Sequence, residues 1–135
     1  MQDYRIEHIA YACADIDKTI EKFKNLGYTL VSDIIDDEAR NVKLVFMINK
    51  SIKIEFVQPV NNNSPVSALL QNQKNSASPY HICYEVDDLR SAIDELKNQK
   101  FVITKEQEPA IAFDNRKVAF LFHRDVGLIE LLEKQ

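Results

Sequence analysis

"HIAYACADIDKTIEKFKNLGYTL", residues 8–30, has a near copy later in the chain, "HICYEVDDLRSAIDELKNQKFVI", residues 81–103. The two stretches keep residue types at matching positions, pairing His8 with His81, Tyr11 with Tyr84, Asp15 with Asp88 and Ile20 with Ile93. The likeness returns further along, where "IKIEFV" (52–57) matches "GLIELL" (127–132) and Glu55 matches Glu130. Such self-similarity indicates one structural unit used twice.

Each copy has the pattern of a strand, a helix and further strands. Asp15 in the first copy, and Asp87 or Asp88 in the second, can cap the helix. Gly27 suits the end of the first helix, where the second copy has Lys100. The clearest later strands are "NVKLVFMI" (41–48), "SIKIEFVQP" (51–59), "RKVAFLF" (116–122) and "GLIELLE" (127–133). The sequence therefore predicts an α+β fold of two paired βαβββ modules.

The chain length fits a single domain of 135 residues. We expect module one over about 4–60, a connection over 61–78 and module two over about 79–135. The turn-rich "PVNNNSP" (59–65) leads into the connection, which continues with "VSALLQNQ" (66–73), a stretch that predicts a short helix. Either module alone would leave one sheet face uncovered, so both should share one fold.

Composition narrows the functional classes. With 45% hydrophobic and 28% charged residues, the chain has the composition of an ordinary globular protein. A net charge of −4 gives no electrostatic support for a nucleic-acid partner. The sequence has neither an apolar run that could span a membrane nor a secretory signal pattern, so we expect a cytoplasmic protein. Cys13 and Cys83 form no CxxC pair and are interpreted as small buried hydrophobic residues.

The two-residue period of strands predicts where the histidines and glutamates point. If Ile54 and Phe56 pack on a helix, Glu55 projects from the opposite face of the sheet, and Glu130 does so in the second copy. The same reasoning turns His8 and His81 to that face. The simpler interpretation is that the glutamates are solvated members of alternating strands, but it does not explain four residues in equivalent positions.

Two imidazoles and two carboxylates in one enclosed space are costly to bury unless a cation lies between them. These donors suit one divalent metal ion, which could be nickel, zinc, cobalt, manganese or iron. Four protein ligands in an octahedral sphere leave two positions for two substrate oxygens. His123 falls outside this set, and we expect it to be structural or to lie at the pocket mouth.

From "HIAYACADID" to "GLIELLEK" the chain resembles the vicinal oxygen chelate superfamily, which includes glyoxalase I, methylmalonyl-CoA epimerase, extradiol dioxygenases and antibiotic-binding resistance proteins. The resemblance implies paired βαβββ modules that form a curled mixed sheet around a metal-binding cavity. It also implies a homodimer, and it assigns the metal ligands as His8, Glu55, His81 and Glu130.

Two branches of the superfamily compete. "HIAYACADID", "SPVSALL" and "HICYEVDDL" look most like the methylmalonyl-CoA epimerase branch, whereas the His-Glu-His-Glu set is similar to bacterial glyoxalase I. Glyoxalase I commonly has an arginine and an asparagine for glutathione where this chain has Ala12 and Pro59. The epimerases tend to have a glycine-rich stretch where this chain has "AFDNRK". The substrate, expected to be a small molecule with adjacent oxygen functions such as a thioester or thiol adduct, is left open.

The leading functional hypothesis is a metal-dependent isomerase or lyase that moves a proton on the carbon next to a carbonyl. The candidate catalytic base is Glu130 or its repeat partner Glu55. Arg116, with Asn115 beside it, is the candidate for binding an anionic part of the substrate, and its alternative is an exposed arginine at a strand start.

Two other functions remain as alternatives. An iron-dependent extradiol-type dioxygenase needs two histidines, one carboxylate and open positions, and Glu55 is a fourth ligand where such enzymes need a vacancy. A non-catalytic small-molecule binding or resistance protein is the other alternative, although it would not need four metal ligands.

Overall fold

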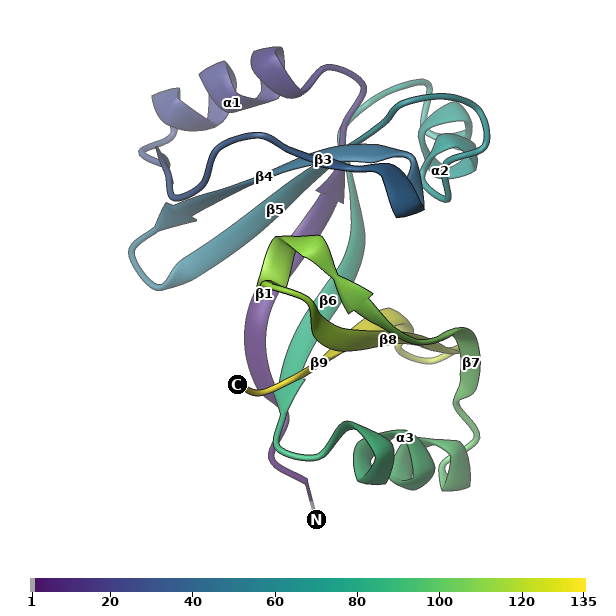
Figure 1. Cartoon of the computed structure of the whole chain (residues 1–135). Helices are drawn as coiled ribbons and strands as arrows, with labels where there is room; N and C mark the ends of the chain where they lie inside the picture. Colours follow the sequence, from purple (N-terminus) through teal and green to yellow (C-terminus); the bar gives the residue numbers. More distant parts are fainter. Residues whose placement is uncertain (1) are drawn as a thin grey trace. The chain divides into compact units, whose positions relative to one another are not determined.

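The computed structural model describes residues 2–135, which divide into two compact units. One unit consists of residues 8–80, and the other of residues 81–135 together with residues 2–7. Each unit has a helix packed on a mixed sheet, in the order predicted from the repeat (Figure 1). The α+β class and the repeated βαβββ pattern are therefore confirmed.

The unit of residues 8–80 has a sheet with strand order β2–β4–β5–β1, and β3 pairs with the first three residues of β4. β1 and β5 are parallel, and the other pairs are antiparallel. The elements are β1 (Arg5–Ala12), α1 (Ile16–Asn25), β2 (Thr29–Leu30), β3 (Ile35–Asp37), a 3₁₀ turn η1 (Glu38–Arg40), β4 (Val42–Asn49), β5 (Ile52–Pro59) and α2 (Ser67–Asn72). The short helix predicted in the connection is thus confirmed as α2.

The unit of residues 81–135 has the strand order β6–β9–β8–β7, in which β6 and β9 are parallel. β8 pairs antiparallel with both of its neighbours. The elements are β6 (Ser78–Val86), α3 (Leu89–Asn98), β7 (Val102–Ala110), a 3₁₀ turn η2 (Ile111–Phe113), β8 (Arg116–His123) and β9 (Gly127–Glu133). The parallel pair in each unit joins the first and last strand of one repeat, which brings histidine and glutamate strands together.

Each helix covers the apolar face of its own sheet. In the first unit, Ile16 and Ile20 of α1 belong to a buried cluster with Ile54 and Phe56 of β5. In the second unit, the apolar face of α3 packs in a cluster with Ile129 and Leu131 of β9. Because side chains alternate along a strand, the glutamate between each apolar pair must point to the other face. The predicted orientation of both glutamate strands is therefore correct.

The two helices begin with the same cap. The side chain of Asp15 accepts a hydrogen bond from the Lys18 amide at 3.1 Å, and that of Asp88 accepts one from the Ser91 amide at 3.0 Å. A carboxylate in this position satisfies one of the free N–H groups of the first helical turn. Of the two aspartates left open in the second copy, Asp88 is the cap.

The two helices also end alike, but with different residues. Gly27 has φ +96° and its amide donates to the Lys24 carbonyl, while the next amide donates to the Phe23 carbonyl. The second copy repeats both bonds with Lys100, at φ 73°, in the place of Gly27. This is the Schellman arrangement, in which a left-handed residue follows the helix, and glycine adopts that conformation at little cost.

We expect the Lys100→Gly variant to be more stable than the natural chain by about 1 kcal/mol, because a left-handed conformation strains any residue that has a Cβ atom. Gly27→Ala, at the equivalent position, should lower the free energy of unfolding by a similar amount. Urea unfolding followed by circular dichroism measures both changes. A Lys100→Gly variant that is less stable than the natural protein would contradict the assignment.

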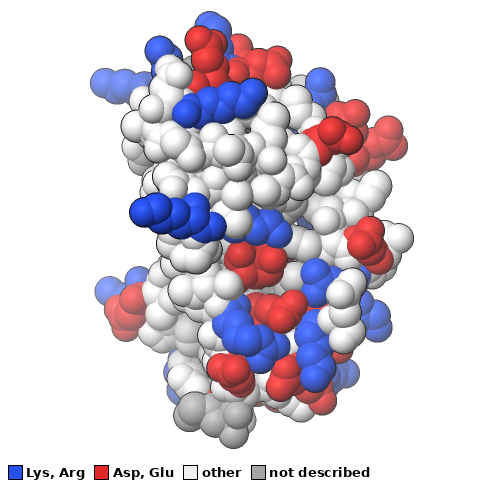
Figure 2. All heavy atoms as spheres, turned by 90° about the vertical axis from the view of Figure 1, so that its left-hand side faces the viewer, with Lys and Arg blue, Asp and Glu red and all other residues white. Residues whose placement is uncertain are grey.

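The surface carries charges of both signs. Lysines and arginines alternate with aspartates and glutamates over the face shown in Figure 2, so that face has a mixed rather than a single-sign field. Among residues 2–135, no helix combines the length and the apolar character needed to cross a bilayer.

Both cysteines are buried free thiols, as the sequence predicted. Cys13 lies in the core cluster of the first unit, together with Ile16. Burial raises the pKa of the Cys13 thiol to about 11, because the thiolate would lose its hydration.

We expect the free energy of unfolding to fall as pH rises from 9 to 11, the interval between the ordinary and the raised pKa of Cys13. The folded state holds the proton in this range and the unfolded state releases it, so the stabilisation is present below pH 9 and lost above it. Denaturant titrations at pH 8 and pH 10.5 on the natural protein and Cys13→Ala measure the difference. An alkaline loss that is equal in both proteins would contradict the prediction.

Candidate metal centre

In the first unit, His8 on β1 and Glu55 on β5 come together. The parallel register places Ile9 opposite Ile54 and Ala10 opposite Glu55, so His8 and Glu55 share the face that does not bear the helix. The His8 Nε2 atom lies 3.3 Å from the Glu55 Oε1 atom. The two residues are only 1% and 6% exposed, and burial to this degree is unusual for a carboxylate.

In the second unit, His81 on β6 and Glu130 on β9 form the same arrangement. Here Cys83 is opposite Glu130, and the His81 Nε2 atom lies 3.1 Å from the Glu130 Oε1 atom. Their exposed fractions are 6% and 5%. The repeat in the sequence thus becomes a repeat of buried histidine–glutamate pairs.

A phenylalanine accompanies each pair, and the sequence reasoning missed it. Phe46 lies opposite Glu55 in the strand register, and its ring meets the His8 ring edge to face at 5.4 Å between centroids. Phe120 lies opposite Glu130, and its ring meets His81 in the same way at 5.1 Å. Such contacts restrict how the imidazole can turn. The signal was available in the strand before each glutamate, which has phenylalanine in both copies.

The spacing within each pair suits metal binding. Bonds of about 2.0–2.2 Å from one ion to an imidazole nitrogen and a carboxylate oxygen place those atoms about 3 Å apart in adjacent positions. The measured separations of 3.3 and 3.1 Å have this size, and they also fit a direct hydrogen bond. Neutral imidazole and carboxylate are ligands of divalent transition metals. Each pair can therefore supply two adjacent ligands to a metal ion.

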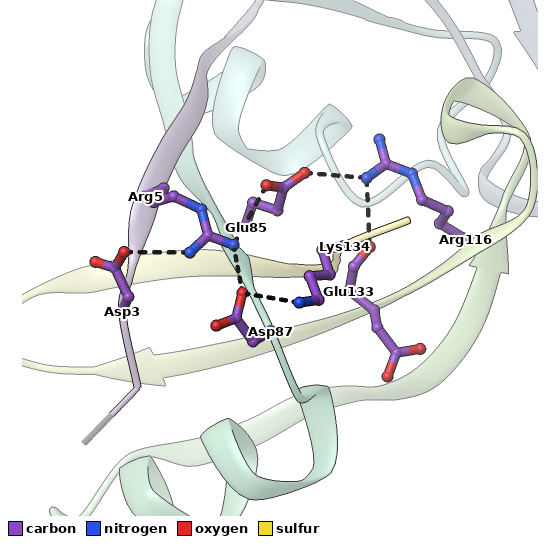
Figure 3. A network of polar contacts seen from close by, with 7 residues as sticks. All are labelled: Asp3, Arg5, Glu85, Asp87, Arg116, Glu133 and Lys134. Atoms are coloured by element: carbon purple, nitrogen blue, oxygen red, sulfur yellow. Dashed lines mark hydrogen bonds and ion pairs between the residues drawn. The ribbon is translucent and has the colours of Figure 1, made fainter.

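Arg116 belongs to an ion-pair network in the second unit (Figure 3). Its Nη1 atom lies 3.1 Å from Glu85 Oε2 and also donates to the carbonyl of Glu133 at 3.4 Å. The other oxygen of Glu85 faces the Arg5 guanidinium, at 3.4 Å from Nη2. Glu85 therefore joins two arginines.

The network continues to Asp87. The Arg5 Nη2 atom donates to Asp87 at 2.9 Å, and the Lys134 Nζ atom lies 3.7 Å from the same carboxylate. The hydrogen bond from Arg5 lowers the pKa of Asp87, and the same bond raises the pKa of Arg5. These side chains connect the β1 strand, β6 and the residue that follows β9.

The remaining candidates lie at a turn or at the end of a strand. Asn115 follows η2 with φ 66°, and its amide donates to the Ala110 carbonyl at 2.9 Å. His123 is the last residue of β8, and its Nδ1 atom accepts a hydrogen bond at 3.0 Å from the amide of Asp125 in the turn that follows. Its ring centroid lies 5.0 Å from that of Phe101. This turn contact fits the structural role expected for His123, while the substrate roles of Asn115 and Arg116 remain predictions.

Comparisons with known proteins agree on one family. The model of the Glyoxalase/Bleomycin resistance protein/Dioxygenase superfamily matches residues 7–120. The mitochondrial methylmalonyl-CoA epimerase of Homo sapiens is 32% identical over 129 residues, which cover 94% of this chain and 72% of the human protein. The ethylmalonyl-CoA/methylmalonyl-CoA epimerase of Cereibacter sphaeroides is 32% identical over 130 residues, or 94% of this chain and 96% of that protein.

A solved structure shows the same fold. The methylmalonyl-CoA epimerase of Streptomyces coelicolor, in complex with 2-nitronate-propionyl-CoA, superposes with a TM-score of 0.80. Its sequence is 23% identical, and the match covers 96% of both chains. The likeness extends over both units of the present structure.

Proposed function

The chain belongs to the glyoxalase/bleomycin resistance protein/dioxygenase superfamily, and on that premise we propose that it is a divalent-metal-dependent epimerase acting on an acyl-CoA thioester. The reaction moves the proton on the carbon next to the thioester carbonyl. The observation that supports this most directly is the pair of buried histidine–glutamate contacts in matching positions of the two repeats. The names of the two relatives, both epimerases of acyl-CoA esters, support the same reaction.

The proposed metal ligands are His8, Glu55, His81 and Glu130, which would together hold one ion of nickel, zinc, cobalt, manganese or iron. When bound, such an ion acts as a Lewis acid that stabilises negative charge on the carbonyl oxygen. The edge-to-face contacts of Phe46 and Phe120 orient the two imidazoles toward this role.

The proton is moved by the carboxylates. An epimerase must remove a proton from one side of a carbon and return it on the other, so two groups on opposite sides serve it best. Glu130 is the proposed base, and Glu55, its counterpart in the repeat, is the proposed proton donor. Both residues are buried, so bulk solvent has little access to them during the transfer, and each exchanges its proton with solvent between turnovers.

Two positions favour a CoA thioester over a glutathione adduct. Where glyoxalase I commonly has an arginine and an asparagine for glutathione, this chain has Ala12 and Pro59, which offer no side-chain hydrogen bond. Arg116 and Asn115 are proposed to contact an anionic part of the substrate, with Glu85 holding the guanidinium. We further propose that the protein is a homodimer, since β7 is an edge strand whose free backbone groups can pair with a second copy. We also propose that it is cytoplasmic.

The test follows deuterium incorporation into methylmalonyl-CoA in D₂O by mass spectrometry, together with the metal content by elemental analysis. Wild-type protein reconstituted with each divalent metal should exchange the proton on the carbon between the two carbonyl groups. The hemithioacetal of methylglyoxal and glutathione, run in parallel, tests the glyoxalase reaction. If only the hemithioacetal is converted, the proposed epimerase function is wrong and the protein is a glyoxalase-type lyase. If neither substrate reacts, a non-catalytic binding protein is favoured.

A further inference from the structure

Lys53 lies against an aromatic ring on the sheet face that carries Glu55. It precedes Glu55 by two residues on β5, so the two side chains project from the same face. The Lys53 Nζ atom lies 4.5 Å from the centroid of the Phe46 ring, on the neighbouring strand β4. The face of an aromatic ring attracts a cation, because the ring quadrupole is negative there. The contact therefore joins a charged, half-buried side chain to a buried one.

The same ring contacts the imidazole of His8. The centroids of the Phe46 and His8 rings are 5.4 Å apart, and the ring planes make an angle of 72°. Both rings are buried, so neighbouring side chains rather than water decide how the imidazole is oriented. Lys53, Phe46 and His8 thus form a chain of contacts across β5, β4 and β1 within one unit.

The second copy keeps the phenylalanine and the histidine but not the lysine. Phe120 meets His81 at 5.1 Å between centroids, with an angle of 81° between the ring planes. In the sequence, Leu128 occupies the position equivalent to Lys53, and a leucine has no charge that a ring face could attract. Phe120 is also half-buried, whereas Phe46 is 4% exposed. The two imidazoles therefore have matching ring contacts that are unequally supported.

We propose that Lys53 is a positioning residue that fixes the His8 imidazole through the Phe46 ring. The ammonium restrains the ring, and the ring limits the rotation of the imidazole that it contacts. Groups that orient a metal-binding histidine contribute to metal affinity without touching the metal. His8 is thus the anchored ligand of the proposed metal site, and His81 is the more adjustable one. The part that concerns the metal rests on the proposed function, whereas the restraint on His8 does not.

The restraint on His8 is tested in metal-free protein by ¹³C relaxation of the histidine rings, which reports their fast motion. In Lys53→Met, the order parameter of the His8 ring should fall, while those of His81 and His123 keep their wild-type values. Lys53→Arg should keep the wild-type value for His8, since a guanidinium also lies favourably over an aromatic face. An unchanged His8 order parameter in Lys53→Met would overturn the inference.

A double-mutant cycle on the affinity for Co²⁺ tests the consequence for the metal. Removal of the ammonium also removes its repulsion of the metal ion, so Lys53→Met alone does not isolate the restraint. Its effect on Kd is therefore measured with Phe46 present and again in Phe46→Leu, where the repulsion is the same but the ring is gone. We expect the two effects to differ by about 3- to 10-fold, with the greater loss of affinity when Phe46 is present. Equal effects would show that Lys53 does not act through Phe46 and would overturn the inference.

The matched control is Lys43→Met, which removes a lysine from an exposed position of β4 in the same unit. Lys43 lies three residues before Phe46, so its side chain projects from the other face of the strand. The His8 order parameter should stay at its wild-type value in this variant, and a fall as large as that in Lys53→Met would overturn the inference. If wild-type protein binds no Co²⁺ while Lys53→Met loosens His8, the proposed metal site is refuted and the restraint on His8 stands.

Discussion

The Glu130→Gln variant is expected to lose proton exchange on the acyl-CoA substrate by a factor of about 10² to 10⁴, to the limit of detection. Glutamine has the size of glutamate and keeps an oxygen that can bind a metal, but it cannot accept the proton from carbon. Glu130 is 5% exposed and lies 3.1 Å from His81, so a substitution of equal size should leave the packing of β9 intact. Deuterium incorporation and metal content, measured on the same sample, separate the two effects.

Glu133→Gln is the control for this experiment, because Glu133 lies on the same strand and its side chain points away from the Arg116 contact in Figure 3. It should keep full activity. The Glu55→Gln variant distinguishes the roles of the two glutamates. If Glu55 only donates the proton on the opposite side, this variant should still exchange the substrate proton with solvent but should no longer invert the configuration of the carbon. Full activity in Glu130→Gln would refute the assignment of the base.

The His81→Ala variant is expected to lose the bound metal. A purified wild-type sample should contain about one transition-metal ion per chain, and removal of one imidazole ligand should weaken metal affinity at least about 100-fold, since even indirect contacts to ligands contribute 10- to 100-fold. After dialysis, elemental mass spectrometry should find wild-type protein loaded and the variant nearly empty. His8→Ala should behave alike, because the two histidines occupy equivalent positions.

His123→Ala provides the comparison, since His123 is the last residue of β8 and accepts a hydrogen bond from the Asp125 amide in the following turn. Its metal content should equal that of the wild type. The thermal unfolding curve of each variant checks that β6 keeps its packing after the substitution. If both His8→Ala and His81→Ala retain the metal ion, the proposed metal site is refuted.

Much of the fold could be predicted because it depends on local patterns. The alternation of apolar residues in "IKIEFV" and "GLIELL" indicates which side of each strand packs on a helix, and the caps Asp15 and Asp88 act within four residues of themselves. The projection of the histidines and glutamates from one sheet face followed from the same period. These features depend on the spacing of residues along one strand or helix, which the sequence shows directly.

The rest depends on which strands become neighbours. The contacts of Glu85 could not be predicted, because its partners Arg5 and Arg116 are far away in sequence and meet it only through the sheet. The strand β7 was not clear either, since its register with β8 shifts on both sides of Lys105. Lys100 gave no sign of a left-handed conformation, because it is not a glycine.

The repeat in the sequence and the units of the structure have different borders. Residues 2–7 pack with residues 81–135, so β1 changes from one unit to the other between Glu7 and His8. Arg5 at one end and Lys134 at the other both contact Asp87. A tag or truncation before Arg5 is thus expected to disturb the C-terminal half of the chain. A circular permutant that starts at His8 and finishes with residues 2–7 would make that unit continuous along the chain.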